Sequence, residues 1–357
     1  MSITKRGSTT IDGRQAEKLL LWYDPSRRAL PWRGTRDAYR VWVSEIMLQQ
    51  TRAEAVKEYY ARFVAALPDV YALAAVDGDR LLKLWEGLGY YSRARNMQRT
   101  AKIVVEEYGG VLPADPAALL RLPGVGLYTA GAVASIAYGV CVPAVDGNAL
   151  RVCKRLEGSY DDVALEAVKR ATALRLLAAM PADRPGEFNQ AMMDLGATVC
   201  LPGAAARCGE CPLAEGCAAC HQGVAAELPV KSPPRPRRIE RRAVLILRRG
   251  ALLALRKRPG KGLLAGLWEL PNALGDDWQP LADTLNIARE SILSIEEMGE
   301  ARHVFTHIEW HMRGFRLELA AVPNGDALRW VSERELEEAY ALPSAFAGFR
   351  GGLYDGR

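Results

Sequence analysis

The segment from Leu122 to Asn148 constrains the possible folds of this chain more than any other. It opens with Leu-Pro-Gly-Val-Gly, which disfavours a helix interior because proline lacks an N–H donor and glycine loses the most backbone entropy. The small, apolar residues from Tyr128 to Tyr138 then predict a buried helix. We therefore expect a tight hairpin that joins two helices, with Pro-Gly-Val-Gly at its turn.

The turn of this hairpin is suited to binding a phosphate group. The backbone N–H groups of Gly124, Val125 and Gly126 would be bare at a helix N-terminus, where the helix dipole also favours an anion. After the second helix, Val-Asp-Gly-Asn presents one acidic side chain, Asp146. A phosphate site followed by a single carboxylate is what an enzyme acting on a nucleic-acid backbone needs. The structural alternative is a Gly-Pro helix connection with Asp146 as an N-cap.

The length and composition indicate a soluble protein of two domains. At 357 residues the chain is too long for one ordinary core, and its 49% apolar and 25% charged residues are typical of globular proteins. The net charge of +5 indicates no partner by itself. No segment has the apolar centre of a signal peptide or the length of a membrane span. We therefore expect no membrane partner and a cytoplasmic location, where cysteines are reduced or bound to metal.

The distribution of histidine excludes one class of mechanism from the first half of the chain. The sequence has 4 histidines, and the first of them is His221. Catalysis before that residue must therefore use carboxylates, lysine, tyrosine or thiols, which rules out a serine–histidine mechanism there.

A long helix is predicted from Tyr39 to Tyr60, and it carries a candidate catalytic acid. Val41, Glu45 and Leu48 are four and three residues apart, so that they share one face of the helix. A carboxyl group on an apolar face is desolvated, which raises its pKa and lets it hold a proton near neutral pH. The two glutamines that follow offer amide groups for base edges. The alternative is a glutamate at the rim of the core, or a buried one neutralised by arginine.

Two further segments combine aromatic residues or glycines with arginines. The loop from Arg27 to Arg33 holds Trp32, which looks exposed and could stack on a base while the arginines contact phosphates. The sequence Gly-Leu-Gly-Tyr-Tyr at 87–91 could wedge into a base stack, and the arginines after it give the next helix a basic side (Arg93, Arg95 and Arg99). A surface turn and a helix C-cap with solvated arginines are the structural alternatives.

The N-terminal domain is expected to be entirely helical. Residues 1–13 form a polar tail, and residues 14–227 form the helical domain, which includes a cysteine-rich loop at 200–220. Besides those already described, helices are predicted over residues 15–23, 81–85, 165–180 and 187–198.

The composition changes abruptly after residue 227. Residues 228–241 are rich in proline and in lysine or arginine, which predicts a semi-rigid basic linker. Beyond it, two apolar runs at 243–247 and 252–256 flank Arg-Arg-Gly and predict a β-hairpin. We therefore expect a second, α/β domain over residues 242–357, and a fold class of multi-domain α plus α/β.

Five of the 7 cysteines lie between residues 200 and 220, namely Cys200, Cys208, Cys211, Cys217 and Cys220. Two residues separate Cys208 from Cys211, and five separate Cys211 from Cys217. In a reducing compartment this density indicates a metal or iron–sulfur site. Zinc held by four thiolates is the structural alternative, and the spacing alone does not choose between them.

Several of these motifs together resemble one family. Leu-Pro-Gly-Val-Gly-Leu-Tyr-Thr-Ala-Gly-Ala followed by Val-Asp-Gly-Asn is similar to the helix-hairpin-helix and catalytic loop of the endonuclease III superfamily. LPWR, VSEIMLQQT, GLGYYSRARN, FNQAMMDLG and the cysteine cluster resemble the MutY-type adenine DNA glycosylases. RKRPGKGLLAGLWELP and HVFTHIEW resemble the Nudix-like recognition domain of the same family. The resemblance runs from about residue 15 to residue 340.

The resemblance implies a monomeric, monofunctional enzyme of the nucleoid. It would flip adenine out of duplex DNA where adenine is opposite 8-oxoguanine or guanine, and leave an abasic site. Glu45 would protonate the adenine and then activate water, and Asp146 would stabilise the cationic sugar. Tyr128 and Asn148 would support them. The implied base-pocket and wedge residues are Arg28, Trp32, Arg33, Gln190, Gln50, Leu88 and Tyr90. The implied readers of the opposite base are Phe305, Thr306 and His307, and the implied ligands of one 4Fe–4S cluster are Cys200, Cys208, Cys211 and Cys217.

The sequence departs from the family pattern in three places. Cys200 and Cys208 enclose seven residues, one more than in the family, and Cys220 offers a competing fourth ligand. Thr306 stands where many members have serine, which keeps the hydroxyl group. The segment 285–300 lacks the glutamate-rich helix with which Nudix hydrolases bind metal, so that we expect no nucleotide hydrolysis.

Three other functions compete with this prediction. A bifunctional lyase of the endonuclease III type needs an amine in the hairpin helix, but that position holds Tyr128 and no lysine occurs between Lys102 and Lys154. A non-enzymatic iron–sulfur module that binds DNA would not need Glu45 and Asp146 together. A Nudix-type nucleotide hydrolase lacks its metal-binding helix.

Overall fold

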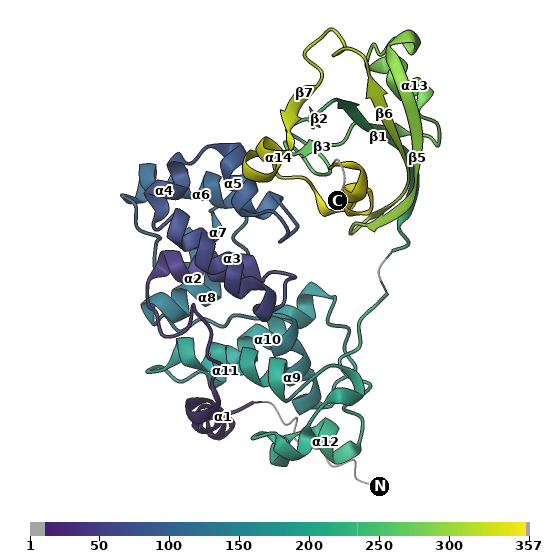
Figure 1. Ribbon diagram of the computed structural model, residues 1–357. Coiled ribbons are helices and arrows are strands. Elements are labelled where there is room, and N and C mark those ends of the chain that lie inside the picture. The colour runs from purple at the N-terminus through teal and green to yellow at the C-terminus, as the bar shows by residue number, and fades with distance from the viewer. Residues whose placement is uncertain (1–10, 234, 355–357) are drawn as a thin grey trace. The chain divides into compact units, whose positions relative to one another are not determined.

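A computed structural model describes residues 11–233 and 235–354 (Figure 1). Most of the predicted N-terminal tail therefore lies outside the described residues. The chain forms two compact units, one from the residues up to Ala74 with Asn96–Pro233, and one from Ala75–Arg95 with the residues beyond Pro233. The segment 75–95, predicted to belong to the helical domain, thus groups with the C-terminal unit. Each unit is described separately below.

The first unit is helical. Its helices are α1 (Gly13–Ser26), α2 (Ala38–Leu48), α3 (Ala53–Ala66), α4 (Val70–Ala75), α6 (Ser92–Tyr108), α7 (Pro116–Leu120), α8 (Leu127–Tyr138), α9 (Gly147–Glu157), α10 (Glu166–Ala179), α11 (Pro185–Thr198) and α12 (Ala218–Gln222). Aspartates begin several of them, as expected of N-caps: Asp12 starts α1 in a capping box with Gln15, and Asp146 starts α9.

The prediction of one helix from Tyr39 to Tyr60 is wrong. The helix ends at Leu48, and α3 begins only at Ala53. The backbone turns at Gln50, whose φ of 58° is in the left-handed region that a helix interior cannot contain. The turn leaves the side chain of Gln50 exposed directly after the helix that carries Glu45.

The predicted hairpin is confirmed between α7 and α8. Gly124 has a φ of 77°, and a Cβ atom there would approach Cβ of Asn96 to 2.8 Å, so that the turn needs glycine. Val125 donates its N–H to the carbonyl oxygen of Leu122 at 3.1 Å, which closes the turn. Within the described ranges, the N–H groups of Gly124 and Gly126 have no hydrogen-bond partner.

One core of the helical unit forms where α1, α9, α10 and α11 meet. It contains Leu19 and Tyr23 of α1, Leu156 of α9, Leu176 of α10 and Phe188 of α11, all of them buried. Figure 1 shows α9, α10 and α11 stacked in this part of the unit. The core fixes the N-terminal ends of α9 and α11, where several candidate site residues lie.

The second unit contains a twisted sheet. Its strands are β1 (Arg238–Arg249), β2 (Leu252–Lys257), β3 (Trp268–Glu269), β4 (Asn272–Leu274), β5 (Ile292–Val304), β6 (Ile308–Leu319) and β7 (Arg329–Ser332), and its helices are α5 (Gly78–Leu84), α13 (Gln279–Thr284) and α14 (Glu333–Ala339). The strand order is β3-β2-β1-β6-β5, with β1 and β6 parallel and β5 and β6 antiparallel. The predicted hairpin is confirmed as β1–β2, in which Arg248 pairs with Leu253.

Strand β1 begins inside the segment predicted to be a linker. Arg238 to Arg241 pair with Ile308 to His311 of β6, so that the linker is shorter than 228–241. The backbone groups of these arginines find partners in the parallel strand, while their charged side chains stay near solvent. The proline and basic residues of 228–241 therefore did not mark the point where the linker ends and the second domain begins.

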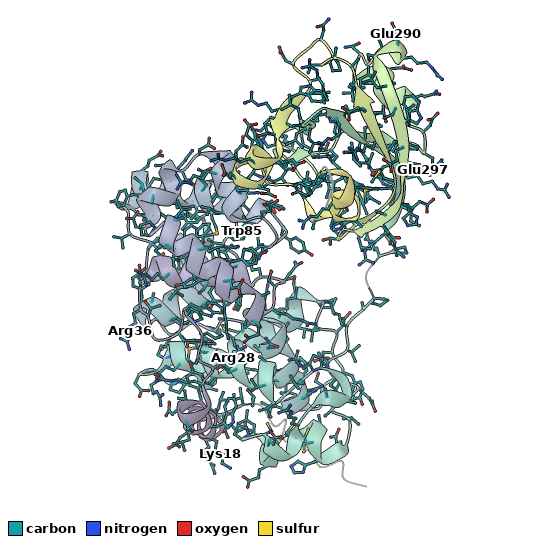
Figure 2. All side chains as sticks on the ribbon, in the orientation of Figure 1. Lys18, Arg28, Arg36, Trp85, Glu290 and Glu297 are labelled. Carbon is teal, nitrogen blue, oxygen red and sulfur yellow. The ribbon has the colours of Figure 1, made fainter. Side chains whose placement is uncertain are left out.

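Alternate residues of β1 pack on opposite faces of the sheet. Val244 and Ile246 join the core that contains Trp310 and Phe346. Ala243, Leu245 and Leu247 join a second core around α13. This alternation is the period of a strand buried on both faces. Most of the segment 285–300, where the sequence analysis expected no glutamate-rich helix, belongs to β5 (residues 292–304). Figure 2 shows Glu297 on that strand.

No helix in the part of the chain that the structure describes is long and apolar enough to cross a bilayer.

Candidate active site

Glu45 lies in α2, where all residues from 41 to 47 are buried, and Glu45 itself is only 4% exposed. The hydroxyl of Tyr128, on α8, donates a hydrogen bond of 2.5 Å to Oε2 of Glu45. Burial raises the pKa of Glu45 most strongly, the Tyr128 hydrogen bond and the charge of Arg33 lower it, and the charge of Asp146 raises it. The net direction is upward, so that this carboxyl group holds a proton at a higher pH than a solvated glutamate.

Asp146 is the N-cap of α9 and is held by two donors. Its Oδ1 accepts from the backbone N–H of Ala149 at 2.7 Å, and its Oδ2 accepts from Nδ2 of Asn148 at 2.7 Å. Burial raises the pKa of Asp146, whereas these hydrogen bonds and the charge of Arg151 oppose the rise. The charge of Asp146 also acts on Glu45 and Tyr128, so that the two carboxyl groups share one electrostatic environment.

Asn148 is itself fixed by Arg151 one turn later on α9. Nη2 of Arg151 donates to Oδ1 of Asn148 and to the carbonyl oxygen of Gly196, each at 2.8 Å. Its Nε donates to the carbonyl oxygen of Cys200 at 2.8 Å. Arg151 thus links the loop with Asp146 to the start of the cysteine-rich loop, and the sequence analysis did not identify it.

Asp194 is a second residue that the sequence analysis missed. This buried carboxylate on α11 accepts from Nε and Nη2 of Arg28 at 2.9 and 2.7 Å, and from Nη2 of Arg33 at 2.9 Å. Asp194 lies four residues after Gln190, on the same helix face, and this spacing in FNQAMMDLG was the available signal. Figure 2 shows Arg28 within the helical unit and Arg36 at its edge.

The candidate base-pocket residues of the helical unit lie near one another. Arg28, Arg33 and Gln190 line a cavity of about 490 Å³, and Oε1 of Gln190 accepts from the hydroxyl of Tyr23 at 2.8 Å. Trp32, expected to be exposed, is only 4% exposed, because its ring packs edge-on against Tyr60 with 5.4 Å between the ring centroids.

In the second unit, Leu88 and Tyr90 differ in exposure. Leu88 is buried, whereas Tyr90 is 48% exposed and has a φ of 46°. Arg93, predicted to contribute to a basic surface, is buried instead. Its Nη2 donates to the carbonyl oxygens of Leu88 and Gly89, and its guanidinium lies 5.2 Å from the centroid of the Trp85 ring. Burial lowers the pKa of Arg93 to about 10. Arg93 fixes the turn before α6, a helix whose residues up to Arg95 belong to this second unit and whose later residues belong to the helical one.

Phe305, Thr306 and His307 form the turn between β5 and β6. The ring of Phe305 packs against His303 and Trp310, with centroid distances of 4.5 and 4.9 Å. Thr306 and His307 are exposed. The turn lines a cavity of about 580 Å³ together with Tyr90, which belongs to the same unit.

The five cysteines of the loop surround one small cavity in the helical unit. Its wall contains Cys200, Cys208, Cys211, Cys217 and Cys220, together with Arg155 and apolar side chains of α9 and α11. Nη1 of Arg155 lies 3.3 Å from Sγ of Cys200. Among the described residues, no group of three or more histidine, cysteine or acidic side chains is arranged to hold a single metal ion.

Comparison with known proteins identifies the family. A model of the HhH-GPD superfamily of base excision DNA repair proteins matches residues 43–175, and a NUDIX domain model matches residues 242–349. The adenine DNA glycosylase of Homo sapiens is 34% identical over 413 aligned residues, which cover 95% of this chain and 73% of the human protein. The chain belongs to the adenine DNA glycosylase family. It is therefore a DNA repair glycosylase of the MutY type.

Other members and solved structures agree with this family assignment. The adenine DNA glycosylase of Mus musculus is 35% identical, with 89% of this chain and 73% of the mouse protein covered. A thermostable thymine-DNA glycosylase is similar in structure, with a TM-score of 0.53, 29% identity, and coverage of 58% of this chain and 95% of that one. A trapped endonuclease III–DNA covalent intermediate has 24% identity and a TM-score of 0.51, covers 59% of this chain and 95% of its own, and shows the helical fold alone.

Proposed function

We propose that this glycosylase flips adenine out of duplex DNA opposite 8-oxoguanine or guanine and hydrolyses its N-glycosidic bond. The observation that carries this proposal is the buried Glu45, whose raised pKa and single tyrosine donor suit a general acid. The family names of its relatives support adenine as the base.

Glu45 would first protonate the five-membered ring of the adenine. Because Tyr128 donates to Oε2, that oxygen acts as an acceptor, and the acidic proton of Glu45 is left for the other oxygen, Oε1. Protonation makes adenine a neutral leaving group. The carboxylate that remains would then take a proton from the attacking water.

Asp146 would stabilise the positive charge that develops on the sugar. A carboxylate held by the N–H of Ala149 and by Asn148 needs little reorganisation when the charge appears. The pairing of one protonated and one ionised carboxyl group is the arrangement that glycoside hydrolysis uses.

Arg28, Arg33 and Gln190 would bind the flipped adenine, with Trp32 supporting the pocket from its buried position. Asp194 holds both guanidinium groups, and we propose that it acts as a positioning residue for them. Gln50 and Tyr90 are both exposed and both at positive φ, and each would enter the base stack. Leu88, which is buried, would support the turn that carries Tyr90. The N–H groups at Gly124 and Gly126 would bind a DNA phosphate, and Val125 would shape the turn.

The reaction is proposed to stop at an abasic site. A lyase needs an amine nucleophile near the sugar, and the helix position for it holds Tyr128. Lys154, the next lysine along the chain, is 1% exposed and is paired with Glu157 at 2.8 Å. This pairing supports a monofunctional glycosylase, because a buried and ion-paired ammonium is a poor nucleophile.

Reading of the base opposite adenine is assigned to the turn of Phe305, Thr306 and His307. The exposed hydroxyl and imidazole of Thr306 and His307 offer hydrogen bonds to a base edge, and the cavity beside Tyr90 gives that base a place. The mechanism needs residues of one chain only, and we propose that the protein acts as a monomer.

We propose that the cysteine loop holds one 4Fe–4S cluster through Cys200, Cys208, Cys211 and Cys217. These four cysteines and Cys220 line one cavity, and a single zinc ion held by four thiolates is the alternative. Cysteines around an apolar cavity, with Arg151 and Arg155 beside them, suit a multi-iron cluster. The cluster would stabilise the loop that Arg151 and Arg155 attach to α9.

One assay tests the proposed reaction. A duplex with adenine opposite 8-oxoguanine should break on a gel only after alkali treatment, and a duplex with adenine opposite thymine should stay intact. Borohydride should trap little covalent complex. Breakage without alkali and efficient trapping would show a lyase, and no breakage after alkali would refute the proposed function.

A further inference from the structure

The cysteine loop contains one more sulfur than a four-iron cluster needs. Cys220 lies on α12, whose N-cap is Cys217, and it lines the same cavity as the four proposed ligands. Cys208 and Cys217 line it as well, so that the three cysteines lie around one cavity. Cys220 therefore belongs to the group of five cysteines around this cavity.

The five cysteines differ in how firmly they are anchored. Cys200, Cys211 and Cys217 pack against the core formed by α1, α9, α10 and α11. Arg155 adds contacts to two of them: Nη1 lies 3.3 Å from Sγ of Cys200, and its carbonyl oxygen accepts from Sγ of Cys217 at 3.3 Å. The core of the helical unit thus fixes three of the proposed ligands, Cys200, Cys211 and Cys217.

Two cysteines are candidates for the fourth ligand. Cys208 and Cys220 both line the cavity, and neither is among the residues that pack against that core. Cys208 is in a short 3-10 turn, Cys208–Glu210, that follows a seven-residue connection from Cys200. Cys220 is in a helix of five residues. Both cysteines therefore lie in short segments that bring them to the same cavity.

We propose that Cys208 and Cys220 are interchangeable ligands of one iron in the cluster. The inference depends on the proposed 4Fe–4S cofactor and on no step of base excision. Either cysteine would complete the set of four thiolates, and the one left out would keep its thiol proton, so that charge and electrons balance in both arrangements without an oxidant or reductant. A cluster with a replaceable fourth ligand survives the loss of either cysteine.

Serine substitutions test the proposal through the metal content of the purified protein. Cys208→Ser and Cys220→Ser should each contain the same iron and sulfide per chain, prepared without air, as the unsubstituted protein. The Cys208→Ser/Cys220→Ser double variant should lose one iron of the cluster and give the electron paramagnetic resonance signal of a three-iron cluster. Cys211 packs against the core, and Cys211→Ser serves as the control that should lose iron as a single substitution.

The results separate this inference from the cofactor itself. Loss of iron from Cys208→Ser alone, to the level of Cys211→Ser, would show that Cys220 does not replace it. Loss of iron from Cys220→Ser alone would show that Cys220 is a required ligand, which also overturns interchange. An unsubstituted protein without iron or sulfide would refute the proposed cofactor, which is a different failure.

Alkylation of the unsubstituted protein gives a second measurement that needs no substitution. With the cluster intact, an iodoacetamide reagent should modify one cysteine of the pair in each chain, Cys208 in some chains and Cys220 in others. Cys141 is exposed and serves as an internal control for full reaction. Peptide mapping that finds modification of Cys220 in every chain and of Cys208 in none would overturn the proposal.

Discussion

Arg151 donates from Nε to the backbone carbonyl oxygen of Cys200 at 2.8 Å, which ties the helix that begins at Asp146 to the cysteine-rich loop. The same guanidinium holds Asn148, the residue that donates to Asp146. The proposed cluster site and the proposed sugar-stabilising carboxylate therefore share one arginine. A change at one site can reach the other through three hydrogen bonds.

Replacement of Arg151 by methionine should weaken both sites. One buried acceptor, the carbonyl oxygen of Gly196, and two part-buried ones would lose their donor. An unsatisfied buried acceptor costs about 1–3 kcal/mol and a part-buried one less, so that the free energy of unfolding should fall by roughly 2–4 kcal/mol. Excision should also slow, because Asn148 would no longer be held. Denaturant unfolding and single-turnover rates measure the two effects, with the exposed Arg170→Met as control. Unchanged stability and rate would refute the coupling.

Glu45→Gln should reduce adenine release by about 10²–10⁴-fold, the usual contribution of a general acid, and leave duplex binding nearly unchanged. Gln has the same shape but cannot donate an acidic proton. Single-turnover excision and a binding titration measure the two effects. Glu54→Gln, at an exposed position of α3, is the control. A variant rate within a few-fold of the unsubstituted enzyme would remove Glu45 from the mechanism.

The raised pKa of Glu45 also affects stability in a direction that can be checked. Because the folded-state pKa lies above the unfolded value, the stability it contributes is present below the unfolded pKa and is lost as the pH rises through the folded pKa. The Glu45→Gln variant should therefore gain more thermal stability at pH 8 than at pH 5. A gain that does not depend on pH would contradict the shift.

Tyr128→Phe should move the pH profile of excision. The Tyr128 hydroxyl favours the ionised form of Glu45, so that its removal should raise the pKa of Glu45 further. Since the protonated acid is the active form, the rate would then fall at a higher pH than in the unsubstituted enzyme. Tyr138→Phe removes a hydroxyl that bonds only to the Leu112 carbonyl in the described structure and serves as control. A shift to lower pH would contradict the proposed roles.

Asp146→Asn should lose activity while keeping its fold. An asparagine oxygen can still accept from Ala149 as an N-cap, but an amide cannot balance a cationic sugar, and the loss should be about 10²–10³-fold. The matched control is Asp115→Asn, the N-cap of α7. The new amide NH2 would face Nδ2 of Asn148, so that the melting temperature should fall slightly while the excision rate falls far more. Equal excision rates would refute the electrostatic role.

The double substitution Thr306→Ala/His307→Ala should reduce the preference for 8-oxoguanine over guanine. Phe305 is best left in place, since its ring packs against Trp310 and its removal would disturb the core. The preference should fall by on the order of 1–3 kcal/mol, as for one lost base contact. Single-turnover rates on both duplexes measure it, with Ser294→Ala as control. Equal loss on the two duplexes would mean that the turn contributes affinity only.

The sequence contained enough information for the hairpin and for the burial of Glu45. Pro-Gly-Val-Gly cannot continue a helix, and the spacing of Val41, Glu45 and Leu48 places the carboxyl group on the apolar face. Both are local properties of the chain. The left-handed turn at Gln50 could not be predicted in this way, because Gln-Gln-Thr contains no glycine or proline to mark it.

Long-range pairing also lay outside what the sequence could specify. Arg28 and Asp194 are 166 residues apart, and no local pattern joins them. Trp32 looked exposed among arginines, but Tyr60 of another helix covers it. Strand β1 extends into the basic segment because its partner β6 continues beside it. In each case a distant segment decided the structure against local composition.

The shared carboxylate of Asp194 has an electrical consequence for the whole pocket. Arg28 and Arg33 bring two positive charges and Asp194 brings one negative charge, so that these three groups together keep one net positive charge. The charge of Arg33 lowers the pKa of Glu45. It would therefore stabilise the carboxylate that remains on Glu45 after its proton has passed to a bound purine.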